Sequence, residues 1–304
     1  MDIVYWKSEI ANFGDELNST YWSTVLGCDP KSVAKGEAIL GIGSILDYDT
    51  TSYSKVHVLG TGSGFEHLNI PNINSYQFWF VRGPLTAKSL GLDKKLAITD
   101  PAILIQDLSD IQPAKKVSGK ITFLPHYLSA MNADWGEVCS RAGIHYRTPM
   151  SSLEDICNDV SSSELVIAES LHGAIIADMY RIPWILAATP PIARSSFKWH
   201  DWCASINLRY EPVLLPWLHT RSIPVWQRVG NYVKCKSSSF GIGPDRWINK
   251  RYAVHGESEI DLCSKILLNT VKTVEPAISD DQLFCDLKSA MHSALNAFSN
   301  HVLS

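Results

Sequence analysis

The chain has little excess charge and no apolar run long enough to cross a bilayer. Its 304 residues carry 27 Lys and Arg against 31 Asp and Glu, a net charge of -4. This balance argues against a broadly basic surface, so we expect no nucleic-acid partner and only a small, local site for an anion. A membrane-spanning helix needs about 20 apolar residues in sequence. The opening MDIVYWKSEI has no apolar signal core, which favours a cytoplasmic location.

Paired cysteines and recognisable nucleotide or metal motifs are absent as well. The seven cysteines are scattered without a C-x-x-C pair, which argues for reduced thiols and against a zinc site or a disulfide framework. The sequence has no metal-ligand spacing, no Walker-type phosphate loop and no G-x-S-x-G elbow. We therefore expect no bound metal.

Aromatic residues, in contrast, are plentiful, with ten tryptophans and eleven tyrosines. We expect them in the core and at contacts with a sugar. Peripheral association with the cytoplasmic face of an inner membrane through some of them stays open.

Short β-rich runs alternate with glycine turns and helical segments, which predicts an α/β fold with parallel sheets. The expected strands are 2–6, 38–40, 56–59 and 77–81 in the first third, then 121–125, 143–147, 164–168 and 182–186. The expected helices include one through Leu90, one from about Asn132, and the segments 152–160, 171–180, 266–271 and 283–298.

A polar stretch at 106–120 divides this pattern into two α/β units. We predict domains at 1–110 and 118–275, with a C-terminal helix in 276–304 that packs back on the first domain. The segment 216–256, rich in Trp, Gly and Ser, has no clear assignment.

The strongest local signal is the apolar strand at 165–168 that leads through Glu169 and Ser170 into a helix with His172 in its first turn. The positive end of a helix favours an anion, and an imidazole beside a phosphate can donate a hydrogen bond or a proton. We therefore predict that Ser170, His172 and Gly173 bind substrate. The alternative is that Ser170 is an N-cap and His172 an interior residue.

Two cations are candidates for holding a small anion. Arg82 follows a strand and precedes a helix, where its guanidinium could clasp a carboxylate or phosphate in bidentate fashion. Lys198 lies after a proline-rich loop among tryptophans and offers a point charge. A surface arginine and a solvated lysine are the alternatives.

His126 and Asp15 are further catalytic candidates. His126 follows the strand at 121–125 and either faces a ligand or caps a turn. Asp15 lies where a helix begins after the first strand, and could take a proton from an attacking hydroxyl or simply stabilise the first helical turn.

Taken in order, a series of short motifs resembles the polysaccharide pyruvyl transferase family. The short length of the chain and the segment KWHDW at 198–202 look most like the branch that decorates bacterial exopolysaccharides such as succinoglycan. The motifs are NFGD at 12–15, GIGS at 41–44, GTG at 60–62, VRGP at 81–84, DPA at 100–102, PH at 125–126 and ESLHGA at 169–174. The resemblance covers roughly residues 1–210.

The resemblance implies two Rossmann-like domains facing a cleft, similar to GT-B glycosyltransferases, with the acceptor on the first and the donor on the second. It also implies phosphoenolpyruvate as co-substrate, no essential metal, and contacts from Arg82 and His172 to the donor. The implied acceptor is a sugar, either of an oligosaccharide or of a lipid-linked precursor. A glycosyltransferase with a nucleotide-sugar donor and a non-catalytic sugar-binding subunit remain the alternatives.

Overall fold

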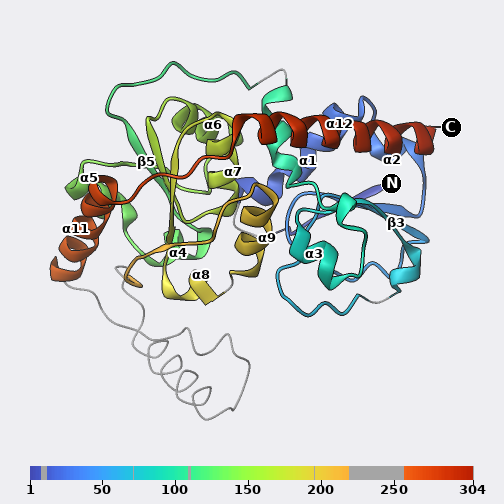
Figure 1. Cartoon of the computed structure of the whole chain (residues 1–304), viewed down its shortest axis with the longest axis horizontal. Helices are drawn as coiled ribbons and strands as arrows, with labels where there is room; N and C mark the ends of the chain where they lie inside the picture. The colour runs from blue at the N-terminus through green and yellow to red at the C-terminus, as the bar shows by residue number, and fades with distance from the viewer. Residues whose placement is uncertain (8–11, 71, 109–110, 195, 219–256, 304) are drawn as a thin grey trace, which may run out of the picture.

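The computed structural model describes residues 1–7, 12–70, 72–108, 111–194, 196–218 and 257–303. Most of the unassigned segment 216–256 therefore lies outside the described residues. Two parallel sheets of four and five strands lie side by side, as Figure 1 shows, with helices around them. The predicted α/β class with parallel sheets is confirmed.

The first sheet contains the four runs predicted as strands in the first third of the chain. They are β1 (Asp2–Val4), β2 (Glu37–Leu40), β3 (Lys55–Leu59) and β4 (Tyr76–Phe80), in the order β1-β2-β3-β4. Ala38, Ile39 and Leu40 are fully buried, because helices cover both faces of this sheet. The helical elements of this half are α1 (Phe13–Leu26), α2 (Pro30–Val33), η1 (Ile73–Ser75), α3 (Pro84–Ser89), η2 (Lys94–Leu96) and η3 (Pro101–Asp107).

The second sheet has the order β6-β5-β7-β8-β9. Its strands are β5 (Ile121–Leu124), β6 (His145–Tyr146), β7 (Leu165–Ala168), β8 (Trp184–Ala188) and β9 (Val213–Leu214). The first four were predicted, whereas β9 is too short to leave a pattern in the sequence. The helices are α4 (Tyr127–Asn132), α5 (Trp135–Ala142), α6 (Leu153–Ser161), α7 (Leu171–Met179), α8 (Pro190–Arg194), α9 (Phe197–Ser205) and α11 (Glu257–Thr273).

One predicted helix start is wrong. The helix expected from about Asn132 is two helices, because α4 ends at Asn132 and α5 begins at Trp135. Asp134 provides the reason, since its side chain accepts a hydrogen bond from Glu137 N at 3.2 Å and so caps α5.

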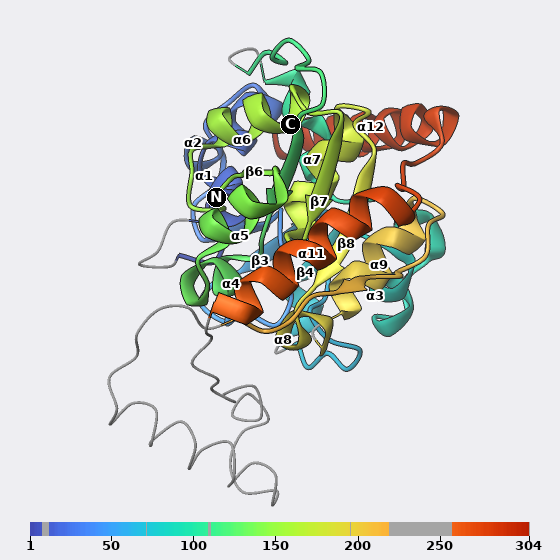
Figure 2. The same ribbon diagram turned by 90° about the vertical axis from the view of Figure 1, so that its left-hand side faces the viewer.

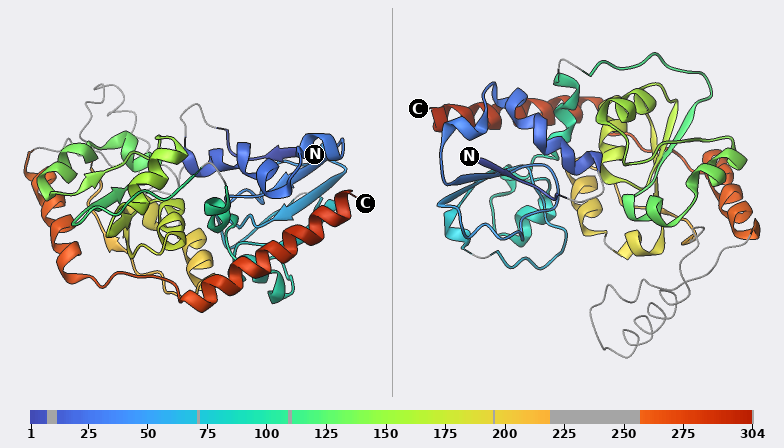
Figure 3. Two further views of the ribbon diagram at one scale, coloured as in Figure 1. Left: turned by 90° about the horizontal axis from the view of Figure 1, so that it is seen from above. Right: turned by 180° about the vertical axis from the view of Figure 1, so that it is seen from behind.

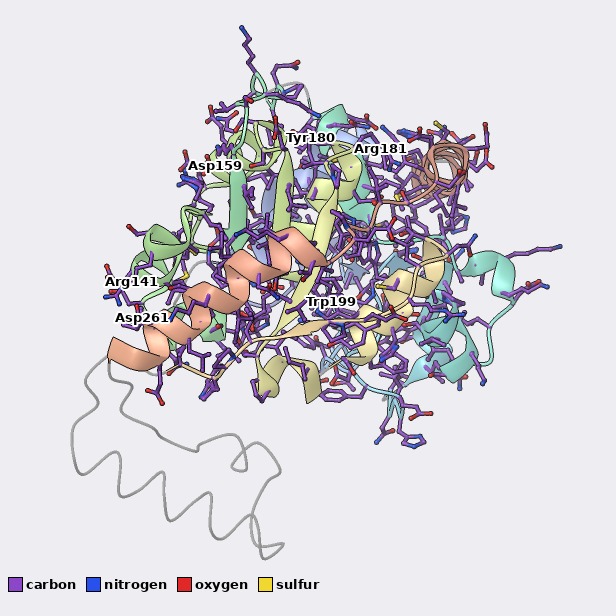
Figure 4. The ribbon with its side chains drawn as sticks, turned by 60° about the vertical axis from the view of Figure 1, so that its left-hand side comes forward. Arg141, Asp159, Tyr180, Arg181, Trp199 and Asp261 are labelled. Carbon is purple, nitrogen blue, oxygen red and sulfur yellow. The ribbon has the colours of Figure 1, made fainter. Side chains whose placement is uncertain are left out.

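Helix α11 crosses one face of the second sheet, as Figure 2 shows. It packs with α5 in a cluster that includes the buried Trp135, Cys263 and Leu267. Arg141 of α5 and Asp261 of α11, labelled in Figure 4, form an ion pair of 2.6 Å at the edge of this contact.

The last helix, α12 (Asp281–Leu303), runs back along the first sheet, as both views in Figure 3 show. Phe298 is fully buried and packs edge-on against His57 and Trp79 of that sheet. Lys288 pairs with Asp107 of η3 at 3.0 Å. These contacts link the C-terminal segment to the first α/β unit.

Turns at the carboxyl ends of strands from both sheets meet in the middle of the molecule. Gly43 and Arg82 follow strands of the first sheet, and His126 and Ser170 follow strands of the second, yet all four line one cavity. Ligands of open parallel sheets bind at the carboxyl ends of the strands, so we expect a ligand-binding site at this junction.

Candidate functional site

The cavity at the junction has a volume of about 310 Å³ and draws its walls from both sheets. Six of the seven predicted site residues line it, although they lie far apart in the sequence. The lining residues are Trp6, Asn12, Asp15, Gly43, Ser44, Ile45, Tyr48, Arg82, His126, Tyr127, Ser170, Leu171, His172 and Lys198.

The N-termini of two helices border the cavity. Asn12 and Ser170 are the N-cap residues of α1 and α7, and neither side chain makes a capping hydrogen bond. The Asn12 amide instead donates to Asp15 Oδ2 at 2.6 Å. Helix N-termini carry a partial positive charge, so both ends favour an anion in the cavity. The sequence predicted this role for α7 alone.

His172 lies in the first turn of α7 and packs against Gly14 of α1. A Cβ atom on Gly14 would lie 2.0 Å from His172 Nδ1, so only glycine allows this approach. Burial, followed by the positive charges of Lys198 and Arg82, lowers the pKa of His172 to about 3. The imidazole is therefore neutral at pH 7 in the empty cavity.

Arg82 is almost completely buried and most of its donors are engaged by the protein. Nη1 donates to Ser44 Oγ at 2.7 Å and to the Gly43 carbonyl at 3.3 Å, while Nη2 donates to the Ser63 carbonyl at 2.6 Å. Nε donates to Asp201 Oδ2 at 3.3 Å. The predicted bidentate clasp on an anion is therefore not set up, and Arg82 contributes a fixed positive charge to the cavity wall.

Asp201 of α9 is a residue that the sequence did not single out. It is fully buried and accepts hydrogen bonds from Thr86 N and Leu85 N at 2.9 Å and from Thr86 Oγ1 at 2.6 Å, in addition to Arg82. It therefore joins α9 to the N-terminus of α3. Asp201 lies in the segment KWHDW at 198–202, in which the sequence predicts a binding role for Lys198 alone.

Two glycines of the predicted motifs make this arrangement possible. A Cβ atom on Gly62 would lie 2.4 Å from Arg82 Cζ, and one on Gly83 would lie 2.3 Å from the Asp201 carbonyl oxygen. Side chains at either position would displace the ion pair. The glycines in GTG and VRGP therefore serve close packing.

Lys198 lies in the first turn of α9 and is partly exposed to the cavity. Within the described residues its ammonium group has no hydrogen-bond or ion-pair partner. Burial, followed by repulsion from Arg82, lowers its pKa to about 8, while Asp15 and Glu169 act in the opposite direction. It is still mainly charged at pH 7, so it can bind an anion directly.

Asp15 lies at the other side of the cavity, in the first turn of α1. Burial raises the pKa of its carboxyl, although the hydrogen bond from Asn12 and the charge of Lys198 act to lower it. A raised pKa makes a carboxylate a better proton acceptor. Asp15 is thus placed both for the structural role and for that of a base.

His126 both caps a helix and lines the cavity. Its Nδ1 accepts a hydrogen bond from Leu128 N at 3.3 Å and caps α4, while the residue also lines the cavity. Its backbone N–H donates at 3.1 Å to Glu169, which also binds Thr189. Glu169, fully buried, holds the cavity loops together and was missed as a separate signal.

Gly173 does not line the cavity, in contrast to its prediction as a substrate-binding residue. A Cβ atom there would lie 2.8 Å from Leu124 Cδ2. Gly173 instead keeps α7 close to β5, as its place beside Ala174 in the sequence also suggests. Ser170, which is buried, does line the cavity.

The described residues contain no group of three or more His, Cys, Asp or Glu side chains arranged to hold a metal ion. Within the same ranges, every helix is too short or too polar to span a bilayer.

Comparisons with known proteins agree with the motif order. The sequence model of the family described as polysaccharide pyruvyl transferase matches residues 52–189. The chain is 36% identical over 215 residues to the succinoglycan biosynthesis protein ExoV of Rhizobium meliloti (strain 1021), an alignment that covers 70% of this chain and 67% of that protein. No solved structure matches the chain. With this identity over two thirds of a curated relative, the chain belongs to the polysaccharide pyruvyl transferase family.

Proposed function

We propose that the protein transfers the enolpyruvyl group of phosphoenolpyruvate to a sugar of an exopolysaccharide or of its lipid-linked precursor. The product is a pyruvate ketal, and phosphate is released. The observation that carries the proposal is a convergence on one cavity of two uncapped helix N-termini and a cation, Lys198, that has no partner among the described residues. Such a site fits a small, highly charged anion.

Phosphoenolpyruvate presents a phosphate and a carboxylate, which need separate contacts. His172 and the N-terminus of α7 suit the phosphate, since backbone N–H groups and an imidazole can both donate to its oxygens. Lys198 supplies the counter-charge within the cavity. Arg82 adds long-range attraction from the wall, because its own donors are engaged. No metal is required for this binding.

The reaction needs one proton delivered and two removed. Protonation of the methylene carbon creates a cationic centre at the neighbouring carbon, which a first sugar hydroxyl attacks with loss of its proton. The bond to the bridging oxygen then breaks, phosphate leaves, and a second hydroxyl attacks to close the ketal. His172 is the proposed acid, and Asp15, whose pKa is raised by burial, is the proposed base, with His126 nearby to assist a hydroxyl.

Aromatic rings on the first-sheet side of the cavity suit the acceptor. Trp6 is 48% exposed and contacts Tyr48 edge-on, with 6.3 Å between ring centroids. Tyr48 and Tyr127 line the same cavity. Exposed aromatic faces stack on the apolar faces of pyranose rings, so we place the acceptor sugar against Trp6.

This assignment includes a GT-B-like division of the chain. Residues 1–110 would carry the acceptor and residues 118–275 the donor, with 276–304 packed across the first unit. The transfer reaction would take place in the cytoplasm, at the inner face of the membrane that holds a lipid-linked acceptor.

A binding test separates this proposal from its rivals. Thermal unfolding of the whole chain is measured with phosphoenolpyruvate and, separately, with a panel of nucleotide sugars. A ligand at about 100 times its Kd stabilises the folded state by about 2.7 kcal/mol. We expect stabilisation by phosphoenolpyruvate alone, and its loss in His172→Ala.

Stabilisation by a nucleotide sugar instead would identify a glycosyltransferase. Failure of both ligands to bind, together with no phosphate release in the presence of oligosaccharide acceptors, would leave a non-catalytic sugar-binding subunit.

A further inference from the structure

Asp100 and His172 face one another inside the protein without a hydrogen bond. Asp100 Oδ2 lies 3.9 Å from His172 Nε2. Both atoms are buried, and neither has a hydrogen-bond partner among the described residues. An unsatisfied polar atom in the interior is costly, so two that face each other indicate an interaction that completes in another state of the site.

The backbone around Asp100 fixes the direction of its carboxylate. Asp100 is the N-cap of η3, and its Oδ1 accepts a hydrogen bond from Ala102 N at 3.0 Å. The next carbonyl, that of Pro101, accepts from Tyr21 Oη at 2.7 Å. With Oδ1 engaged, Oδ2 is the oxygen left to face His172.

The imidazole is restrained from the opposite side. Gly14 lies against Nδ1, while Nε2 is enclosed near Asp100. The ring therefore sits between the first turn of α1 and the N-cap of η3, and it lines the cavity between them. A small movement of the ring toward Asp100 would shorten the 3.9 Å separation between Nε2 and Oδ2 to hydrogen-bond distance.

We propose that Asp100 is the positioning residue for His172: its Oδ2 accepts the Nε2–H, which leaves Nδ1 as the atom directed to the donor phosphate. When the donor binds, His172 takes up a proton from solvent on Nδ1 and lies as an imidazolium between the Asp100 carboxylate and the phosphate. The proton uptake on donor binding rests on the proposed function, whereas the hydrogen bond between Asp100 and His172 does not.

The charges around the pair explain why the proton arrives with the ligand. Lys198 and Arg82 face His172, and together with burial they disfavour the imidazolium in the empty cavity. Asp15, on α1, lines the same cavity. A phosphate between these groups neutralises the cations and adds negative charge, so the pKa of His172 rises on binding.

The surroundings of Asp100 also decide its charge. Burial raises the pKa of Asp100 to about 6, an effect that Arg82 opposes and Asp201 reinforces. Tyr21, whose own pKa is raised by burial and by Asp100, keeps its proton. Asp100 is therefore ionised above pH 6 and can accept the Nε2–H.

The test is the tautomer of His172 in the ligand-free protein. Nitrogen chemical shifts of protein with labelled histidine distinguish Nε2–H from Nδ1–H, and His172→Gln identifies the signal by its loss. We expect Nε2–H in the wild type. In Asp100→Asn, the Asn oxygen keeps the bond from Ala102 N, so its NH2 group faces Nε2 as a donor and the ring changes to Nδ1–H.

Asp107→Asn, at the other end of η3, is the matched control and leaves the tautomer unchanged. A wild type in the Nδ1–H form, or a tautomer that Asp100→Asn leaves unaltered, overturns the inference. If Asp100→Asn does not fold, the wild-type tautomer alone decides.

Calorimetry in buffers of different ionisation enthalpy tests the proton uptake on donor binding. Phosphoenolpyruvate binding at pH 7 should take up a proton in the wild type and in Asp107→Asn, but not in Asp100→Asn. Binding without proton uptake in the wild type contradicts the imidazolium. Absence of binding contradicts the proposed function instead, and leaves the tautomer result to decide the role of Asp100.

Discussion

Gly14 lies directly against the imidazole of His172, so that the first turn of α1 and the first turn of α7 meet at one side chain. The two residues are far apart in the sequence and lie in helices of different α/β units. Their contact joins the helix end that borders the cavity in one unit to that in the other. It also makes Gly14 a sensitive probe of the site.

We predict that Gly14→Ala lowers kcat/KM by about 100-fold or more with only a modest loss of stability. A Cβ atom would lie 2.0 Å from His172 Nδ1 and force the ring to move, and a displacement of about 1 Å can cost that much in rate. Alanine within a helix is more favourable than glycine by about 1 kcal/mol, which offsets part of the strain. Steady-state kinetics and urea denaturation measure the two effects.

The control is Gly136→Ala, because Gly136 is also the second residue of a helix that begins with an aromatic residue. Its Cβ atom would approach no atom closer than 3.3 Å. Equal losses of activity in the two variants would show that displacement of the His172 ring does not cause the loss in Gly14→Ala.

The buried pair of Arg82 and Asp201 predicts a large loss of stability. In Asp201→Ala, the guanidinium and the N–H groups of Leu85 and Thr86 lose their acceptor inside the protein. Removal of one member of a buried ion pair costs about 3–5 kcal/mol. Urea denaturation should find a loss of this size, against at most about 1 kcal/mol for Asp281→Ala, which removes the exposed partner of Arg181. A loss below 1 kcal/mol for Asp201→Ala would contradict the structural role.

The sequence predicted the strands well because most of them are short apolar runs, and β2, β3, β5, β7 and β8 are buried over most of their length. It predicted the cavity from the residues that follow those strands, and six of seven site residues lie there. Gly173 lies outside the cavity lining. A glycine at a helix start can serve either a ligand or close packing, and only its closeness to Leu124 reveals the packing role.

Other features depend on contacts between distant segments, which no local pattern records. Asp201 accepts hydrogen bonds from the N-terminus of α3, although it lies more than a hundred residues away in the sequence. Asp100 faces His172 across the junction of the sheets. Arg82 lines the cavity, but no local pattern indicated its partners Ser44 and Ser63, which lie on other loops. The sequence indicated the chemistry of the Arg82 side chain. It could not indicate how many of the guanidinium donors other protein groups already engage.

Asp159 should confer stability that acid removes. Burial alone would raise its pKa, but hydrogen bonds from Lys120, His145 and Arg147 outweigh this and lower it to about 2. Because the pKa is depressed in the folded state, the contribution is complete above the unfolded value near 3.8 and disappears as pH falls through about 2.

We therefore expect Asp159→Asn to lose about 1–3 kcal/mol at pH 7 and the difference from wild type to shrink below pH 4. Asp155→Asn, an exposed change on the same helix, is the control. A difference independent of pH would exclude the charge as its origin.

Trp6 should determine the affinity for the acceptor and not for the donor. Its ring is exposed beside Tyr48, so Trp6→Ala removes a stacking surface while Lys198 and His172 stay in place. Loss of a stacking contact is worth about 0.5–1.5 kcal/mol, so we expect the acceptor KM to rise about 2- to 10-fold. The Kd for phosphoenolpyruvate should stay unchanged. Trp6→Phe keeps an aromatic ring, so its acceptor KM should lie between those of the wild type and Trp6→Ala. An unchanged acceptor KM would place the acceptor elsewhere.

Lys198 gives the sharpest test of the donor site, because its charge can be removed either by mutation or by pH. A hydrogen bond to a charged group contributes about 1.5–3 kcal/mol, so Lys198→Ala should raise the Kd for phosphoenolpyruvate about 10- to 100-fold at pH 7. Lys95→Ala, which removes an exposed lysine, should leave it unchanged. Burial lowers the pKa of Lys198 to about 8, so the free wild-type protein loses this charge as pH rises through that value. Affinity should therefore fall above pH 8 in the wild type and in Lys95→Ala. In Lys198→Ala the affinity should be weak and should fall less steeply over the same range, because only the proton uptake on His172 remains. A wild-type profile no steeper than that of Lys198→Ala would mean that the Lys198 ammonium does not bind the donor.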